Sequence, residues 1–151
     1  MKWQIKVFDE LTASEVYDIL KLRCEIFIVE QQCHYPDVDG ADRGAWQLFS
    51  YADDGGLAAS MRILRPGVTY DALAMGRVAV APQFRGRGLA RAMMEHAIDF
   101  AANRLGERII KIGAQVYLRD FYTSLGFRPI SEEYPEDGIP HIDMAYEADE
   151  I

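Results

Sequence analysis

Alternation of hydrophobic and polar residues divides the first half of the chain into strand-like stretches. Alternating, β-prone residues occupy positions 3–8, 46–51 and 57–64. The sequence DDGG at 53–56 predicts a hairpin turn that joins the second of these strands to the third. Residues 74–80 are mostly apolar and predict a strand that is more deeply buried. The first half of the chain should therefore contain four strands.

Three other stretches repeat their apolar residues at helical spacing. The first begins at Thr12, where Thr-Ala-Ser-Glu forms a capping box, and continues to about Val29. The second covers residues 87–105, and the third covers residues 116–125 and ends at Gly126. The apolar stripe expected on the second helix is Ala90, Met93, Met94, Ala97, Ala101 and Leu105.

Charged residues share the apolar side of the first predicted helix. Its apolar line passes through Val16, Leu20 and Phe27, and the same face carries Arg23 and Glu30 at helical spacing. Because charge on a core-facing side of a helix needs a partner or a cleft, this face is a candidate binding surface.

The order of the elements indicates the fold class. Short strands at 108–113, 127–130 and 141–146 alternate with the last two helices. Strands followed by a strand–helix–strand–helix–strand sequence favour a mixed sheet flanked by helices, of the α/β or α+β class. At 151 residues and 17.1 kDa the chain fits one domain, residues 1–151.

Composition narrows the setting of the protein. No run approaches the ~18 apolar residues of a membrane span, and the N-terminus does not resemble a signal peptide, so we expect a cytoplasmic protein that has no membrane partner. Cys24 and Cys33 lack the spacing of a zinc site or of a disulfide framework, so no metal is expected.

Net charge disfavours one class of partner. Sixteen basic residues against twenty-four acidic ones give a formal net charge of −8, which repels nucleic acid. A local exception is the basic cluster formed by Arg85, Arg87 and Arg91. Such a cluster in an acidic protein calls for an anionic ligand or for a structural partner.

These arginines belong to the most informative segment, residues 77–90. Here a strand leads through Gly86 and Gly88 into a helix, whose first amides and dipole favour phosphate oxygens. The segment is not a Walker A loop, because GxxxxGK[ST] is absent, and it fails the GxGxxG pattern because the third glycine is replaced by Arg91. The alternative is an ordinary turn, but three arginines exceed what a turn requires.

Several motifs resemble one family. Residues 83–88, QFRGRG, resemble the Q/R-x-x-G-x-G/A motif of the GNAT superfamily of acyl-CoA N-acyltransferases, and residues 121–127, FYTSLGF, resemble its FYxxLGF segment. Four further segments resemble one branch of that family, the ElaA-like branch: residues 22–31, 37–40, 113–115 and 137–142. Together these segments span nearly the whole chain.

The resemblance implies a twisted mixed sheet whose fourth and fifth strands splay apart and hold acetyl-CoA. The pyrophosphate is expected on the turn, and the amide near Val78 is expected to face the thioester carbonyl. Gln115 occupies a position where many relatives carry Asn. The residues implied to contact the cofactor are Val78, Ala79, Val80, Gln83, Arg85, Gly86, Arg87, Gly88, Leu89, Ala90, Gln115 and Tyr122.

The implied reaction is transfer of an acetyl group from acetyl-CoA to a primary amine of a small molecule or peptide, by direct attack in a ternary complex. Tyr122 matches the tyrosine that protonates the leaving thiolate in many relatives; a plain core aromatic is the alternative. The fourth strand lacks the Glu that often serves as base, which leaves Glu30 and His141 as candidates. A solvated Glu and a hydrogen-bonded strand His are the plainer interpretations.

The acceptor amine is expected at the first helix and the acidic loop that follows it. An ammonium group could be attracted by Glu30, Asp37 and Asp39, beside Arg23 and Phe27. These acids could instead belong to a generally acidic surface, with Arg23 paired to a neighbouring carboxylate. The loop does not have calcium-binding spacing.

Two other functions compete with this one. A catalytically silent CoA-binding or regulatory domain would explain the missing base on the fourth strand. An acyl-homoserine-lactone synthase would explain Arg23 and Phe27, but those enzymes lack a turn like RGRG. The sequence leaves open which amine accepts the acetyl group, which acyl chains fit, and whether the protein forms a homodimer.

Overall fold

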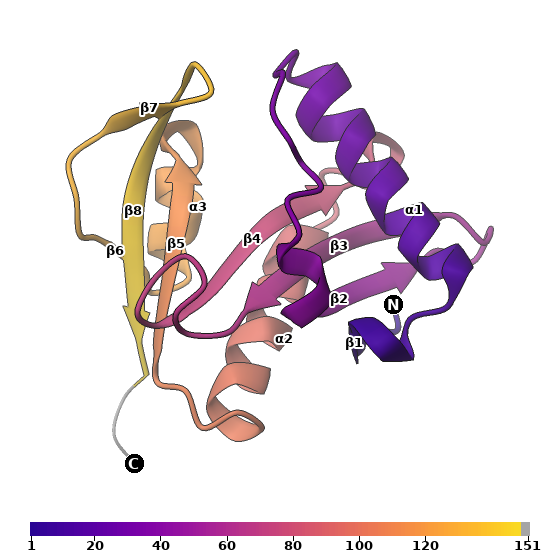
Figure 1. Cartoon of the computed structure of the whole chain (residues 1–151), viewed down its shortest axis with the longest axis horizontal. Helices are drawn as coiled ribbons and strands as arrows, with labels where there is room; N and C mark the ends of the chain where they lie inside the picture. The colour runs from indigo at the N-terminus through magenta and orange to yellow at the C-terminus, as the bar shows by residue number, and fades with distance from the viewer. Residues whose placement is uncertain (149–151) are drawn as a thin grey trace.

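The computed structural model describes residues 1–148 and contains one open, twisted sheet with helices on both faces (Figure 1). The strand order is β1-β2-β3-β4-β5-β8-β6, and β7 pairs with β8. Among the strands of residues 1–148, only β4 and β5 are parallel neighbours, so the predicted mixed α/β sheet is confirmed. The strands are β1 Gln4–Val7, β2 Trp46–Tyr51, β3 Leu57–Leu64, β4 Leu73–Val80, β5 Ile109–Gln115, β6 Arg128–Pro129, β7 Tyr134–Glu136 and β8 Ile139–Glu147.

The sheet divides where β4 meets β5. These strands pair only at Leu73 with Ile110 and at Ala74 with Lys111, after which they diverge (Figure 1). β5 then pairs with β8 along its whole length, from Ile109 to Gln115. The V between β4 and β5 is the splay that the sequence predicted, and it separates β1–β4 from β5–β8.

A β-bulge interrupts β4 inside the V. The register passes from Ser60 opposite Ala79 to Arg62 opposite Gly76, so β4 carries one residue more than β3 between these pairs. Arg77 lies at the bulge with a φ of 52°, in the left-handed region that side chains rarely adopt. Such strain persists only where surrounding contacts hold it.

The first helix follows the predicted range but changes its winding. α1, Ala13–Arg23, begins with the predicted capping box, in which Thr12 and Glu15 exchange hydrogen bonds of 2.9 and 3.1 Å. It continues as the π-helical segment η2, Cys24–Glu30. The wider π turn rotates later side chains away from the expected line. The deeply buried apolar residues are Ile19, Leu22 and Ile26, whereas the predicted line Val16, Leu20 and Phe27 is only partly buried.

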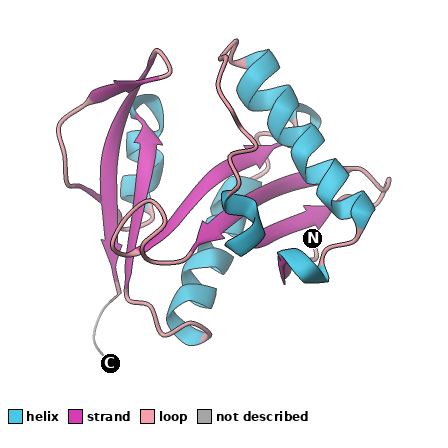
Figure 2. Cartoon of the chain, viewed as in Figure 1, coloured by secondary structure: helices cyan, strands magenta, loops and turns pink. Residues whose placement is uncertain are grey.

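The other helices cover the sheet where the sequence placed them (Figure 2). α2, Leu89–Asn103, packs on β2, β3 and β4 on the face opposite α1. Its stripe residues Met93, Met94, Ala97 and Ala101 are fully buried, as predicted. α3, Arg119–Ser124, follows the short helix η5, Val116–Leu118, and contacts β5. The remaining short helices are η1 Phe8–Glu10, η3 Ala41–Gly44 and η4 Pro82–Phe84.

Two features near the C-terminus differ from the prediction. β7 was not predicted, and it pairs with the start of β8, with Tyr134 opposite His141. β6 is only two residues long. Along residues 1–148 no helix is both long and apolar enough to cross a membrane.

Candidate active site

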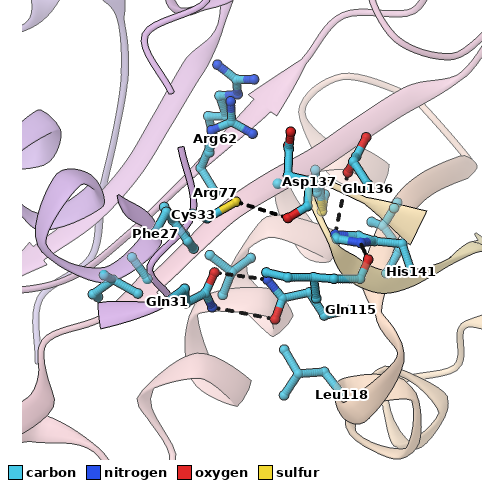
Figure 3. Close-up of a pocket in the computed structure, with 18 of the residues that line it drawn as sticks. Phe27, Gln31, Cys33, Arg62, Arg77, Gln115, Leu118, Glu136, Asp137 and His141 are labelled. Carbon is cyan, nitrogen blue, oxygen red and sulfur yellow. Dashed lines mark hydrogen bonds and ion pairs between the residues drawn. The ribbon is translucent and has the colours of Figure 1, made fainter. Parts of the chain in front are cut away.

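A cavity of about 790 Å³ lies between the diverging strands β4 and β5. Its walls come from η2, the loop at 31–40, β3, β4, β5, α3 and the β7–β8 hairpin. Figure 3 shows side chains from both halves of the sheet pointing into it. Most of the residues that the sequence nominated line this cavity. Those that do not are Gln83, Gly86, Arg87, Gly88 and Leu89, at the glycine turn, together with Arg23 and Asp37.

The glycine turn forms one end of the site. Gly86 and Gly88 both have left-handed backbones, with φ of 77° and 75°, and Gly88 is the residue that precedes the first turn of α2. A Cβ at either glycine would meet nothing within 4 Å, so the backbone here faces open space. The turn therefore presents unshielded amides at the positive end of a four-turn helix, which suits phosphate oxygens.

Arg85 and Glu30 connect this turn to η2. The Arg85 guanidinium donates two hydrogen bonds of 2.9 Å to the Glu30 carboxylate and a third, of 3.1 Å, to the Val80 carbonyl. Hydrogen bonding from Arg85 lowers the pKa of Glu30. Glu30 is therefore a carboxylate already occupied by a cation, which makes it a weaker proton acceptor.

Strand β4 supplies the middle of the wall. Val78, Ala79 and Val80 all line the cavity, directly beyond the bulge at Arg77. A bulge interrupts the ladder and redirects the backbone. That the backbone near Val78 faces a reacting group stays a prediction.

Tyr122 enters the cavity from α3. Its side chain is 7% exposed and packs edge-on against Phe121 and Phe127, with ring centroids 5.1 and 5.9 Å apart. Burial, with a smaller contribution from Tyr117, raises the pKa of Tyr122 to about 12. The hydroxyl therefore keeps its proton throughout the physiological range and is available as a proton donor.

Gln115 bridges the two sides of the V instead of standing free. Its amide exchanges hydrogen bonds of 3.2 and 3.5 Å with Gln31, directly after η2, and Figure 3 shows this pair across the cavity. A second bridge runs from the Cys33 thiol to the Asp137 carbonyl, at 3.4 Å. These two contacts hold the loop that follows η2 against β5 and against the β7–β8 hairpin.

His141 has an oriented ring. Its Nδ1 lies 2.7 Å from the Ile139 carbonyl oxygen, which can only accept, so Nδ1 carries a proton. Its Nε2 lies 3.4 Å from the Glu136 carboxylate, and the ring stacks on Tyr134 at 25° and 6.1 Å. In the neutral ring, Nε2 therefore holds the free lone pair.

The acidic loop is neutralised by arginines. Arg23, Asp37, Arg77, Asp39, Arg62 and Asp42 alternate in a closed circuit, which we call the arginine–aspartate ring. Successive contacts around it measure 2.9, 2.8, 3.4, 2.7, 3.4 and 2.7 Å. The 2.8 Å contact from Arg77 Nε to Asp37 is a charge contact without hydrogen-bond alignment.

The ring corrects the expected roles of Arg23 and Asp37. Arg23 is 1% exposed, and neither residue lines the cavity. Both lie behind its wall because the π turn and the loop bring opposite charges together, so we assign them a structural contact. Asp39 does line the cavity, but hydrogen bonding from Arg62 lowers its pKa and its charge is already balanced.

Comparison with known proteins identifies the family. A model of the GNAT acetyltransferase domain matches residues 27–148. The chain belongs to the GNAT acetyltransferase family. Protein ElaA of Escherichia coli K12 is 37% identical over 149 residues, and the match covers 97% of this chain and 97% of ElaA. The resemblance to the ElaA-like branch is thereby confirmed.

Solved structures of GNAT-fold proteins agree with this assignment. An acyl-CoA N-acyltransferase from Pseudomonas aeruginosa has a TM-score of 0.90 and 35% identity, covering 97% of this chain and 99% of its own. The crystal structure of Escherichia coli ElaA has a TM-score of 0.89 and 36% identity, covering 97% and 100%. Coverage is nearly complete in each case, so the whole described fold is shared.

Sequence reasoning missed part of the site of this GNAT protein. Tyr70 and Tyr134 line the cavity, and both donate hydrogen bonds to Asp143 of β8. Strand alternation alone could have placed Asp143 beside His141 on one face of β8. No local signal marks Tyr70, which lies in the loop between β3 and β4.

Proposed function

We propose that this protein transfers an acetyl group from acetyl-CoA to a primary amine of a small molecule or peptide, by direct attack in a ternary complex. The observation that carries the proposal is the continuity of the site: the glycine turn at the start of α2 opens into the cavity between β4 and β5. Membership of the GNAT family supports an acyl-CoA-dependent N-acyltransferase.

The residues present fit acetyl-CoA. Amides from about Arg85 to Ala90 are suited to the pyrophosphate, because Gly86 and Gly88 leave that backbone uncovered. Arg87 is exposed beside them and adds positive charge. The pantetheine arm would lie along Val78 and Val80, where β4 has no partner strand on the β5 side. Bound there, acetyl-CoA supplies an activated acyl group.

Two proton transfers fall to this chain's own side chains. Tyr122 donates its hydroxyl proton to the departing sulfur, since it is buried in the cavity wall and remains protonated. An alkyl amine with a pKa of about 10.4 is mostly protonated at neutral pH, so a proton acceptor is also needed.

We assign the proton acceptor to His141 rather than to Glu30. Nδ1 of His141 is held by the Ile139 carbonyl, so in the neutral ring Nε2 accepts the proton, directly or through water, and the Glu136 carboxylate 3.4 Å away stabilises the imidazolium that forms. Glu30 is bonded twice to Arg85 at the phosphate end of the site, and its pKa is lowered. His141 therefore has an oriented nitrogen lone pair, whereas the Glu30 carboxylate is already bound by Arg85.

The activity is tested by following thiol release from acetyl-CoA with a panel of primary amines. Release that depends on the amine is expected, together with a new amide product detected by mass spectrometry. If the protein binds acetyl-CoA but releases no thiol with any amine, a silent CoA-binding domain is the better account.

The cofactor site is tested separately by calorimetry with CoA. Gly88→Trp should abolish measurable binding, because a side chain there occupies the turn and disfavours its left-handed backbone. Gly55→Trp is the matched control: Gly55 has a φ of 88°, has open space around it, and lies in the β2–β3 hairpin. Equal CoA affinity in both folded variants would contradict the assignment of the turn.

A further inference from the structure

Three side chains from different segments meet beside β5 and β8, where two of them, Tyr70 and Tyr134, line the cavity. The hydroxyls of Tyr70 and Tyr134 donate to the same Asp143 oxygen, Oδ1, at 2.8 and 2.6 Å. Tyr70 comes from the β3–β4 loop, Tyr134 from β7 and Asp143 from β8. We call these three residues the phenol–carboxylate cluster. Neither the phosphate turn nor the proposed proton transfers use it.

Gly113 of β5 makes room for the cluster. A Cβ at this position would lie 3.3 Å from both phenol oxygens and 3.8 Å from Asp143 Oδ1. The hydroxyls therefore converge over bare backbone, in the register position directly opposite Asp143. Gly113, Tyr70 and Tyr134 all line the cavity, so the phenol oxygens are within reach of a ligand in it.

The cluster presents negative charge and hydrogen-bond acceptors but no positive charge. Within residues 1–148, Asp143 forms no ion pair with Lys, Arg or His. Each phenol has one proton and donates it to Asp143, so its lone pairs remain for an N–H donor. Burial, followed by the hydrogen bond to Asp143, raises the pKa of both phenols, so neither adds a charge of its own. An ammonium group supplies both the missing cation and the N–H donors.

The position of the cluster relative to His141 suggests which ammonium group it binds. His141 and Asp143 point to the same face of β8 and are two residues apart, which corresponds to about 7 Å along a strand. The cluster is therefore too far along the sheet to hold the nitrogen that gives its proton to His141 directly. The separation between His141 and the cluster matches the distance between two amino groups joined by a chain of about four carbons.

We propose that the phenol–carboxylate cluster binds a second, non-reacting ammonium group of the acceptor, so that the preferred acceptors are small diamines. This inference rests on the proposed acetyl transfer to amines. The reacting amine faces His141, while Tyr70 and Tyr134 accept N–H hydrogen bonds from the distal ammonium and Asp143 balances its charge.

The test compares 1,4-diaminobutane with n-butylamine, which differ only in the distal amino group. The kcat/KM of the wild-type protein should favour the diamine by roughly 10-fold or more, the value of a hydrogen bond to a charged group. Asp143→Asn and the double variant Tyr70→Phe/Tyr134→Phe should lower the diamine to the level of the monoamine. The KM for acetyl-CoA and the kcat/KM of the monoamine should not change.

Tyr51→Phe is the matched control. Tyr51 also donates to a carboxylate, that of Asp18 at 2.8 Å, but this pair joins β2 to α1 outside the cavity. Its loss should leave the diamine preference intact. Equal efficiency of both amines with the wild-type protein, or a preference that survives in Asp143→Asn, overturns the inference.

A binding measurement separates this inference from the proposed reaction. If neither amine releases thiol, 1,4-diaminobutane is titrated into the CoA-saturated protein by calorimetry. Binding that is lost in Asp143→Asn supports the subsite while the proposed activity fails. Absence of binding, or equal binding to the variant, overturns the subsite as well.

Discussion

Acidic side chains on the two sides of the cavity have different kinds of partner. In and directly behind the wall formed by η2, the loop at 31–40, β3 and β4, each of the three aspartates of the arginine–aspartate ring contacts two arginines. On the wall formed by β5, β7 and β8, Asp143 contacts two phenols, and Glu136 contacts His141. The first wall is internally neutral, whereas the second offers acceptors and negative charge to a ligand.

This contrast teaches that the electrostatic potential in a site depends on whether its carboxylates are paired with cations, and not on the number of acidic residues. The formal net charge of −8 suggests a generally acidic cleft, and the loop that contains Asp37 and Asp39 looks like its source. Three arginines cancel the three aspartates of that loop. Asp143 is only half-buried, and its two side-chain partners are neutral phenols. On the second wall we therefore infer that the substrate provides the balancing positive charge.

The largest expected effect comes from breaking the ring at its most buried member. Arg23→Met removes the cation that contacts Asp37 and Asp42, and Asp37 is itself buried. The loss should be about 3–5 kcal/mol in the free energy of unfolding, measured by urea denaturation. A loss below about 1 kcal/mol would show that the arginine–aspartate ring does not stabilise the fold.

The next largest expected effect is on kcat and concerns Tyr122. Tyr122→Phe removes the proposed proton donor but keeps the packing against Phe121 and Phe127. With the best amine found, kcat should fall by roughly 10²-fold while the affinity for acetyl-CoA is retained. A kcat near that of the wild type, under conditions where chemistry limits turnover, would remove Tyr122 from the mechanism.

Acid should weaken the first wall in a defined pH window. Hydrogen bonding from Arg62 lowers the pKa of Asp39. Burial acts to raise the pKa of Asp42, but the hydrogen bonds and charges of Arg23, Arg62 and Gln47 together outweigh it, so that pKa is lowered as well. Because both folded pKa values lie below the unfolded value of about 3.9, their stabilisation is complete above that pH and is lost as the pH falls through the folded values. Unfolding free energies measured from pH 7 down to the acid limit should show this loss.

The matched variant for this pH dependence is Asp39→Asn. It should be less stable than the wild type at pH 7 and should lose less stability below pH 4, since one of the titrating groups is gone. Parallel curves for the two proteins would contradict the assignment.

The smallest expected effect is at the exposed pair of Glu30 and Arg85, whose side chains are 45% and 42% exposed. Arg85→Met should change the free energy of unfolding by no more than about 1 kcal/mol, because solvent screens such a pair. It serves as the surface counterpart of Arg23→Met in the same denaturation experiment. A change as large as that of Arg23→Met would mean that burial does not explain the difference between the two arginines.

Most elements were predictable because their signals are local. The capping box at Thr12, the hairpin at 53–56 and the glycine turn at Gly86 and Gly88 each depend on a few neighbouring residues. The strands β2 and β3 have the predicted bounds for the same reason. The glycine turn was the part of the candidate site that the sequence marked most clearly.

The two walls could not be predicted because their contacts join distant residues. The arginine–aspartate ring brings residues 37–42 to Arg23, Arg62 and Arg77, and the phenol–carboxylate cluster joins Tyr70 to Asp143 across 73 positions. The π winding of η2 also has no simple sequence pattern, and it changes the position of Glu30 relative to Arg23, which lies just before it. Side-chain pairing across a sheet has to be seen in three dimensions.

The most direct test of the account is the pH dependence of kcat/KM for the best amine in His141→Gln and Glu30→Gln, measured beside the wild type. The account places the proton acceptor on the second wall, so His141→Gln should lower kcat/KM and flatten the limb that rises with pH. Glu30→Gln should keep that limb, because Glu30 is engaged by Arg85. A flattened limb in Glu30→Gln together with a wild-type profile in His141→Gln would contradict the account.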